Sequence, residues 1–310
     1  MKIEEIIQKY NYSDELSNFL KEVYPKLVDY FGDENLVYSS LSNTEIVLCN
    51  NVYNCLDERN MLEMDDEKVV KNDNLKQAAG VYCSKPQITY NKLENKYSLD
   101  KVDRIIAINA NDLMHESTKA CLIHEICHLI KSYYKEYEIN NDTLVAHSGL
   151  INTIYQLNQN EGLVTKKVTF EDGVGLEEGL NSVAEEEITS KVIGKEYKSS
   201  GYGVVNAVAR NVTSFDDNLI KEFIGAQTTH DTSKLSEILG QNYHELLSFT
   251  DNLYEKNLKL MSFTITPEER KQLEAELKDY IVEKYTPIHA DLKRTFSSER
   301  KSWLCLKCQK

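Results

Sequence analysis

CLIHEICHLI, residues 121–130, places two histidines four positions apart inside an apolar run. Positions i and i+4 of an α-helix lie one turn apart on the same face, so His124 and His128 can reach a single ion. The apolar residues between them would turn toward the core. The stretch therefore predicts a helix that is packed on one side and carries two potential metal ligands on another.

Glu125, directly after the first histidine, completes an H-E-x-x-H motif. It is rotated by about 100° from His124 around the helix axis, toward the open side of a bound ion. There it can act as general base, taking a proton from a zinc-bound water and passing it to a leaving amine, as in H-E-x-x-H metallopeptidases. Random placement of the 7 histidines and 50 acidic residues gives about 0.03 such matches. The alternative is a buried helix whose histidines only form hydrogen bonds.

A Zn²⁺ site of this kind needs a third protein ligand. The next histidine, His147, lies 19 residues beyond His128, too far for a short-spaced third histidine. The segment that follows is GLEEGLNSVAEE, residues 175–186. With it the chain resembles the gluzincins, the thermolysin-like and aminopeptidase-like metallopeptidases, whose third ligand is a glutamate on a downstream helix. The resemblance implies Glu178 as this ligand and Glu177 as the fallback; a solvated acidic helix start is the alternative.

The resemblance covers residues from about 80 to 215, with one departure. Thermolysin-like proteins carry an aspartate one turn after the ligand glutamate, where it orients a zinc histidine. Here Ser182 occupies that position, and Asn181 and Glu185 lie nearby on the same helix face. A hydroxyl or a different carboxylate could take over this task.

Two further roles are implied by the resemblance. A donor to the oxyanion of the scissile carbonyl is expected, with Tyr202 the first candidate and His147 the second. The strand predicted for RIIAINAN, residues 104–111, would be the sheet edge that pairs with an extended peptide substrate. Packing or a turn is the alternative role for Tyr202, and an ordinary sheet strand is the alternative for 104–111.

Periodicity predicts an α+β, helix-rich protein. The resemblance implies a small mixed sheet packed on the H-E-x-x-H helix and on the glutamate helix. The expected elements outside the motif are a helix between a Ser13 cap and Gly32 that is kinked or divided at Pro25, strands at 44–49, 81–91 and 104–111, a loop or exposed helix at 57–76, a strand pair within 143–170, and a helix opened by a Thr266–Glu269 capping box. We expect a zincin-like catalytic domain at 1–195, a helical subdomain at 196–296 and a tail at 297–310.

Composition excludes several classes of function. The formal net charge is −14, and basic residues do not cluster as they do in nucleic-acid-binding proteins. No signal peptide or apolar run of about 20 residues is present, so we expect a cytoplasmic protein that binds neither nucleic acid nor membrane. The 7 cysteines are then expected as reduced thiols, and the C-terminal pair Cys305 and Cys308 has no second pair with which to form a zinc site.

The main hypothesis is a zinc-dependent metallopeptidase that acts on a peptide or protein substrate. Two alternatives remain open. One is a regulatory or partner-binding module whose zinc is structural. The other is a cytoplasmic regulatory peptidase that cuts a single protein.

Overall fold

The computed structural model describes residues 2–62, 78–160, 163–199, 202–261 and 265–307. The protein is α+β and 59% helical, with one mixed and one antiparallel sheet, so the predicted fold class is confirmed at this level. Two compact units form: one contains Met1–Ser148, Thr153–Phe170 and Ala184–Ser199, and the other contains Gly149–Asn152, Glu171–Val183 and Ser200–Lys310.

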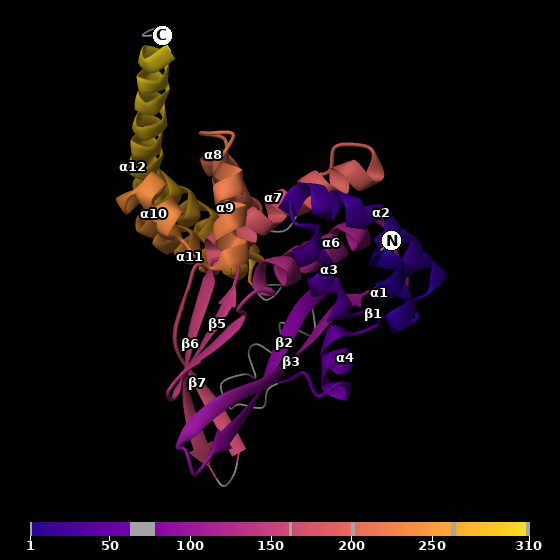
Figure 1. Ribbon diagram of the computed structural model, residues 1–310. Coiled ribbons are helices and arrows are strands. Elements are labelled where there is room, and N and C mark those ends of the chain that lie inside the picture. Colours follow the sequence, from indigo (N-terminus) through magenta and orange to yellow (C-terminus); the bar gives the residue numbers. More distant parts are fainter. Residues whose placement is uncertain (1, 63–77, 161–162, 200–201, 262–264, 308–310) are drawn as a thin grey trace. The chain divides into compact units, whose positions relative to one another are not determined.

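The first unit carries both sheets and the helix with the H-E-x-x-H motif (Figure 1). Its elements are α1 (Lys2–Tyr10), α2 (Asp14–Phe31), α3 (Glu34–Ser42), β1 (Glu45–Cys49), α4 (Val52–Glu58), β2 (Gly80–Asn91), β3 (Lys96–Asn109), α6 (Glu116–Ser132), β4 (Tyr137–Asn140), β5 (Thr143–Ser148), most of β6 (Ile151–Asn160) and β7 (Leu163–Asp172), and the second half of α7 (Val174–Ile193).

The mixed sheet has the strand order β1-β3-β2. β1 pairs with β3 in parallel, from Glu45 opposite Ile105 to Cys49 opposite Asn109. β2 and β3 form a long antiparallel hairpin (Figure 1). The strand predicted at 104–111 is therefore the end of β3, the central strand, and the prediction that it is a sheet edge is wrong. Short-range sequence patterns cannot show that its second edge is occupied, because β1 comes from a distant part of the chain.

α2 begins and ends where its sequence signals place it. The Ser13 side chain accepts the backbone N–H of Leu16, and Gly32 closes the helix with a left-handed φ of 72°. The helix passes through Pro25 without a break, so the alternative prediction of two separate helices is wrong. Position 25 falls in the middle of a helix whose apolar face is fully packed, and this packing outweighs the lost hydrogen bond.

The four-stranded sheet has the order β4-β5-β6-β7, where the sequence indicated only a strand pair. The predicted first strand is divided into β5 and β6 at Gly149, whose φ of +63° reverses the chain. A similar reversal at Asn141, with φ of +56°, joins β4 to β5. Single residues in the left-handed region therefore add two strands to the expected hairpin.

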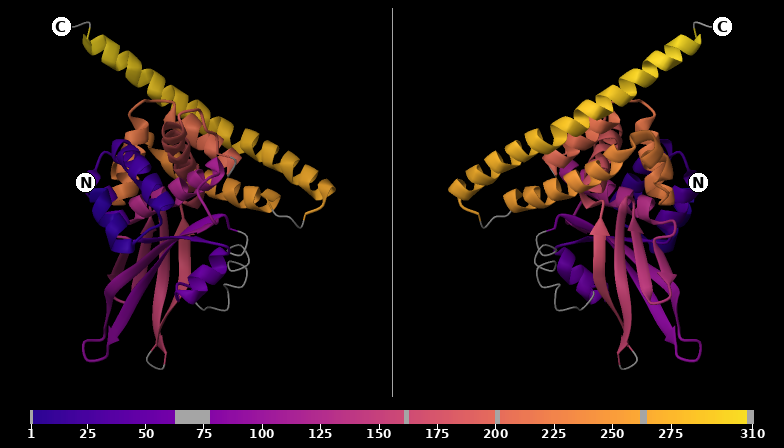
Figure 2. Two further views of the ribbon diagram at one scale, coloured as in Figure 1. Left: turned by 90° about the vertical axis from the view of Figure 1, so that its right-hand side faces the viewer. Right: turned by 90° about the vertical axis from the view of Figure 1, so that its left-hand side faces the viewer.

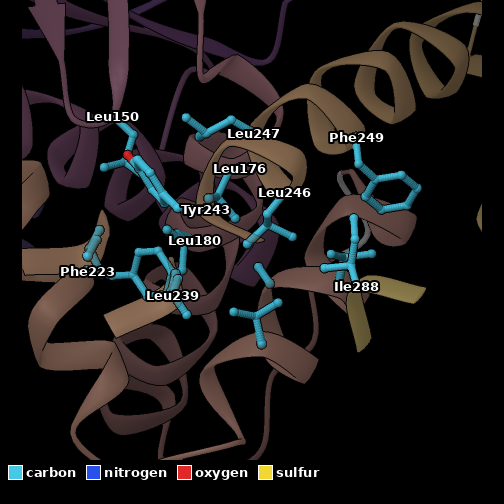
Figure 3. Packing of buried hydrophobic residues seen from close by; sticks show 14 of the residues in the cluster. Leu150, Leu176, Leu180, Phe223, Leu239, Tyr243, Leu246, Leu247, Phe249 and Ile288 are labelled. Atoms are coloured by element: carbon cyan, nitrogen blue, oxygen red, sulfur yellow. The ribbon is translucent and has the colours of Figure 1, made fainter. Parts of the chain in front are cut away.

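The second unit is mainly helical and buries one large apolar cluster. Its helices after α7 are α8 (Gly203–Thr213), α9 (Leu219–Thr229), α10 (Ser233–Leu239), α11 (Gln241–Met261) and α12 (Pro267–Lys307). Figure 2 shows α12 as one long rod with α11 alongside part of it. Figure 3 shows Leu176 and Leu180 of α7 among apolar side chains of the later helices, so this unit holds the first half of α7 by hydrophobic burial.

The capping box that opens α12 is confirmed. The backbone N–H of Glu269 donates to Thr266 Oγ1, and the backbone N–H of Thr266 donates back to Glu269 Oε2 at 2.8 Å. Most of the predicted loop or helix at 57–76 and residue Cys308 lie outside the described residues. Among the helices that the structure describes, none combines the length and hydrophobicity needed to cross a membrane.

The start of α7 contains a glycine that the packing requires. A Cβ atom on Gly175 would lie 2.0 Å from the carbonyl oxygen of Thr250, on α11. We predict that Gly175→Ala lowers the free energy of unfolding by about 1–3 kcal/mol, because the backbones of the two helices must move apart. Urea denaturation followed by circular dichroism measures the change.

Gly225, within α9, provides the control. A Cβ atom there meets nothing within 4 Å. Gly225→Ala should therefore raise the free energy of unfolding by about 0.5–1 kcal/mol through helix propensity alone. Equal stabilities of the two variants would show that the α7–α11 approach imposes no constraint.

Candidate metal centre

α6 presents the two histidines of the motif on one face. Its apolar residues, including Ile123, Ile126 and Ile130, are fully buried, which fixes the rotation of the helix against the mixed sheet. His124 is itself only 8% exposed. The Nε2 atoms of His124 and His128 face each other at 3.2 Å. Two nitrogen ligands of a tetrahedral zinc ion lie about 3.3 Å apart, so the pair is already spaced as zinc ligands are.

The other ring nitrogen of His124 is held by Glu185 on α7. Nδ1 of His124 lies 3.0 Å from Glu185 Oε2, and the carboxylate also accepts the Ser199 hydroxyl at 3.1 Å. An imidazole that donates through Nδ1 has its lone pair on Nε2, the atom that faces His128. Glu185 therefore orients His124, the task that an aspartate performs in thermolysin-like proteins. The buried hydroxyl of Ser182 has no hydrogen-bond partner among the described residues.

Glu185 lies in a buried and electronegative surrounding. Burial and then the Glu185 carboxylate, which accepts a hydrogen bond from Tyr197, raise the pKa of Tyr197 to about 12. Burial, followed by the charges of Glu125 and Glu185, also raises the pKa of the Cys121 thiol. The two carboxylates therefore act on the same thiol, which places the proposed general base and the orienting acid in one neighbourhood. Cys121 remains a protonated thiol at neutral pH.

Glu125 is held by the backbone of β2. The N–H of Tyr82 donates to Glu125 Oε2 at 2.6 Å. The side chain of Tyr82 points into a second polar cluster, where its hydroxyl donates to Glu136 at 2.5 Å and Arg104 pairs with the same carboxylate at 2.8 Å. Burial raises the pKa of Glu136 and the Arg104 charge opposes this rise. Tyr82 is thus fixed at both ends, and its N–H is a rigid donor to the carboxylate of the motif.

Glu178 is brought to the histidines, as the family resemblance implied. One ligand atom from each of His124, His128 and Glu178 lies within 4.8 Å of the others, and these residues form a group that could hold a metal ion. Glu178 and Glu185 are seven residues apart on α7. Two helical turns separate them by about 10 Å along one face, so a single helix carries both the candidate third ligand and the acid behind His124.

Glu177, the fallback ligand, has a different task. It is fully buried and accepts the backbone N–H of Leu150 at 2.9 Å and the side-chain amide of Gln227 at 2.7 Å. The N-terminus of α7 is also anchored, because Asp251 of α11 accepts the N–H groups of Gly173 and Gly175. These bonds fix the first turns of the helix that carries Glu178.

The two candidates for the oxyanion donor stay predictions. Tyr202 caps α8 with a φ of +47°, and its ring lies 5.4 Å from that of Tyr254. Burial and then the Glu178 charge raise the pKa of Tyr254, while a hydrogen bond with Tyr202 acts in the opposite direction. The pair of tyrosines is therefore close to the third ligand. His147 lies on β5, and its backbone N–H donates to the carbonyl of Glu136 at 2.8 Å.

Several residues of the site carried no signal in the sequence. Tyr82 contributes a backbone N–H, which any residue except proline could supply. Tyr197 and Ser199 follow α7 in a segment without periodicity, and Tyr254 is one of 19 tyrosines. Only the three-dimensional arrangement singles these residues out.

Comparison of the whole chain with protein-family profiles, with curated protein sequences and with solved structures finds no match.

We predict that Glu185→Gln lowers the affinity for Zn²⁺ by about 10–100-fold, because a neutral amide no longer holds the His124 imidazole in the required tautomer. Competition with a chromophoric chelator measures the affinity. Glu187→Gln is the matched control, since Glu187 lies on the same helix, is exposed and pairs only with Lys191 among the contacts shown here. Equal affinities of the two variants would contradict the orienting role.

Proposed function

We propose that this chain is a zinc-dependent metallopeptidase. The observation that carries the proposal is the convergence of one ligand atom each from His124, His128 and Glu178 within 4.8 Å of one another. Glu125 directly follows the first histidine on α6. Two imidazoles and one carboxylate are the ligand set of a catalytic zinc site with an open fourth position. The 3.2 Å distance between the two Nε2 atoms is close to the distance between two nitrogen ligands of one zinc ion.

Each residue of the site would have a separate role in the reaction. When bound, the ion would supply a Lewis acid that lowers the pKa of a coordinated water to about 7. Glu125 would accept a proton and later deliver it to the leaving amine, held in position by the Tyr82 N–H. Glu185 would keep His124 in the tautomer that offers Nε2, and stabilise the charge that the imidazole shares with the ion.

The substrate would be an extended peptide or protein segment. Because β3 is central, β2 is the strand beside Glu125 with an edge that no other strand occupies among the described residues. Pairing of the substrate backbone with β2 would give affinity with little side-chain selectivity. Tyr202, whose neighbour Tyr254 lies near Glu178, is the first candidate for stabilising the oxyanion, and His147 is the second.

Substitution of the general base tests the chemistry. We predict that Glu125→Gln lowers peptide hydrolysis by at least about 10²–10⁴-fold, because an amide cannot take up the proton. Zinc content and melting temperature should change little, since the amide carbonyl of glutamine can still accept the Tyr82 N–H. The assay is cleavage of a peptide library with and without chelator.

The same assay distinguishes the alternatives. A wild-type protein that binds zinc but cleaves neither the library nor any folded protein would favour a non-catalytic zinc-binding module. Cleavage of one folded protein and of no short peptide would favour a regulatory peptidase with a single substrate.

Removal of the third ligand tests the site itself. We predict that Glu178→Ala purifies without zinc, with a loss of affinity greater than the roughly 10–100-fold expected for an outer partner. Metal analysis by inductively coupled plasma mass spectrometry measures the content. Glu187→Ala, an exposed position on the same helix, should retain the metal. Full zinc occupancy of Glu178→Ala would exclude this residue as a ligand.

A further inference from the structure

A cavity of about 680 Å³ lies within the first unit, at residues that neither the metal group nor its supporting contacts use. One wall is the tip of the β2–β3 hairpin, from Tyr90 to Tyr97 (Figure 1). The opposite wall is the β4–β5 turn at Asn141 and Asp142, together with Gln156–Gln159 of β6. The volume falls within the roughly 300–1,000 Å³ typical of small-molecule sites.

The hairpin wall presents two aromatic rings. Tyr90 and Tyr97 face each other across the strands, with ring centroids 4.8 Å apart and ring planes tilted by 46°. The Tyr90 hydroxyl donates to Asn95 Oδ1 at 2.5 Å, so the amide NH₂ of Asn95 is left as a donor at the rim. Both rings are half-buried, which keeps them in place and leaves part of each ring accessible.

The opposite wall is held by hydrogen bonds to one turn. The carbonyl of Asp142 accepts the backbone N–H of Leu157 at 2.7 Å and the side-chain amide of Gln156 at 3.0 Å. The Gln156 side-chain oxygen is then available as an acceptor. Partial burial, then Tyr90 and then the Asp142 charge raise the pKa of Tyr97. The Asp142 carboxylate therefore lies near the aromatic wall.

The chemistry of the lining is polar and almost neutral. The charged residues are Glu94, Lys96 and Asp142, which leave a net charge of about −1 and do not favour a phosphate or a polyvalent cation. Five of the lining residues are Asn or Gln, whose side chains each offer both donors and an acceptor. Sugar hydroxyls have the same dual character, and the C–H face of a pyranose packs well on an aromatic ring.

We propose that this cavity binds a short neutral oligosaccharide, with the Tyr90–Tyr97 pair as the stacking platform and the amide side chains of β6 as partners for the hydroxyl groups. The inference does not depend on the metal group, because no lining residue belongs to that group. A peptide is less suited to this cavity, since Ile139 and Leu157 are the only aliphatic residues among the described residues that line it, and Leu157 is 2% exposed.

Isothermal titration of the full chain with tetrasaccharides of glucose, N-acetylglucosamine, mannose and galactose tests the proposal. The wild-type protein should bind at least one of them at millimolar concentration. Tyr97→Ala should weaken this binding by about tenfold, equivalent to ~1.4 kcal/mol. Gln159→Ala, at an exposed position of the lining, should weaken it several-fold.

Tyr134→Ala is the matched control, because this tyrosine is 52% exposed and lies outside the cavity. It should bind the sugar as the wild type does. Absence of binding by all four tetrasaccharides would overturn the proposal. Equal sugar affinities of Gln159→Ala, Tyr97→Ala and Tyr134→Ala would also overturn it. The same holds if only peptide displaces the sugar and Tyr97→Ala has no effect on binding.

Discussion

The hydrogen bond between His124 Nδ1 and Glu185 is the interaction on which the geometry of the site depends. It joins α6 to α7, and it determines which nitrogen of the imidazole faces His128. A histidine that is 8% exposed cannot exchange this partner for water without cost. Ser199 and Tyr197 also bind this carboxylate, so further hydrogen bonds hold the acid in place. The ligand pair is thus pre-oriented by the protein.

α7 carries two functions at positions two helical turns apart. Glu185 orients a histidine and Glu178 offers a ligand oxygen, so a shift of the helix along its axis would disturb both residues together. The helix start is accordingly held by several independent contacts: the Asp251 carboxylate on two backbone N–H groups, the buried Glu177 on Leu150, and the close backbone approach at Gly175. Most of these groups are polar and buried, which favours one arrangement because each alternative leaves a group unpaired.

Sequence patterns predicted the features that depend on residues close to one another in the chain. The spacing of His124 and His128, the caps of α2 and α12 and the acidic helix start at Glu178 are all encoded within a few residues. The long-range pairing was not predictable in this way. β3 is central because β1, from a distant part of the chain, pairs with the edge that its hairpin partner β2 leaves open. The hold on Glu125 comes from the backbone of Tyr82, and a backbone donor leaves no residue preference to detect.

The balance of charge around the histidines supports a bound cation. Glu125 and Glu185 both raise the pKa of the Cys121 thiol, so their carboxylates lie close enough to act on one group, and Glu178 adds a third acid to the same pair of imidazoles. Like charges gathered in a partly buried space destabilise a fold unless a positive charge joins them. A divalent ion held by His124, His128 and Glu178 would provide that charge. Such an ion would therefore also add to the stability of the fold, because it would neutralise charges that otherwise repel one another.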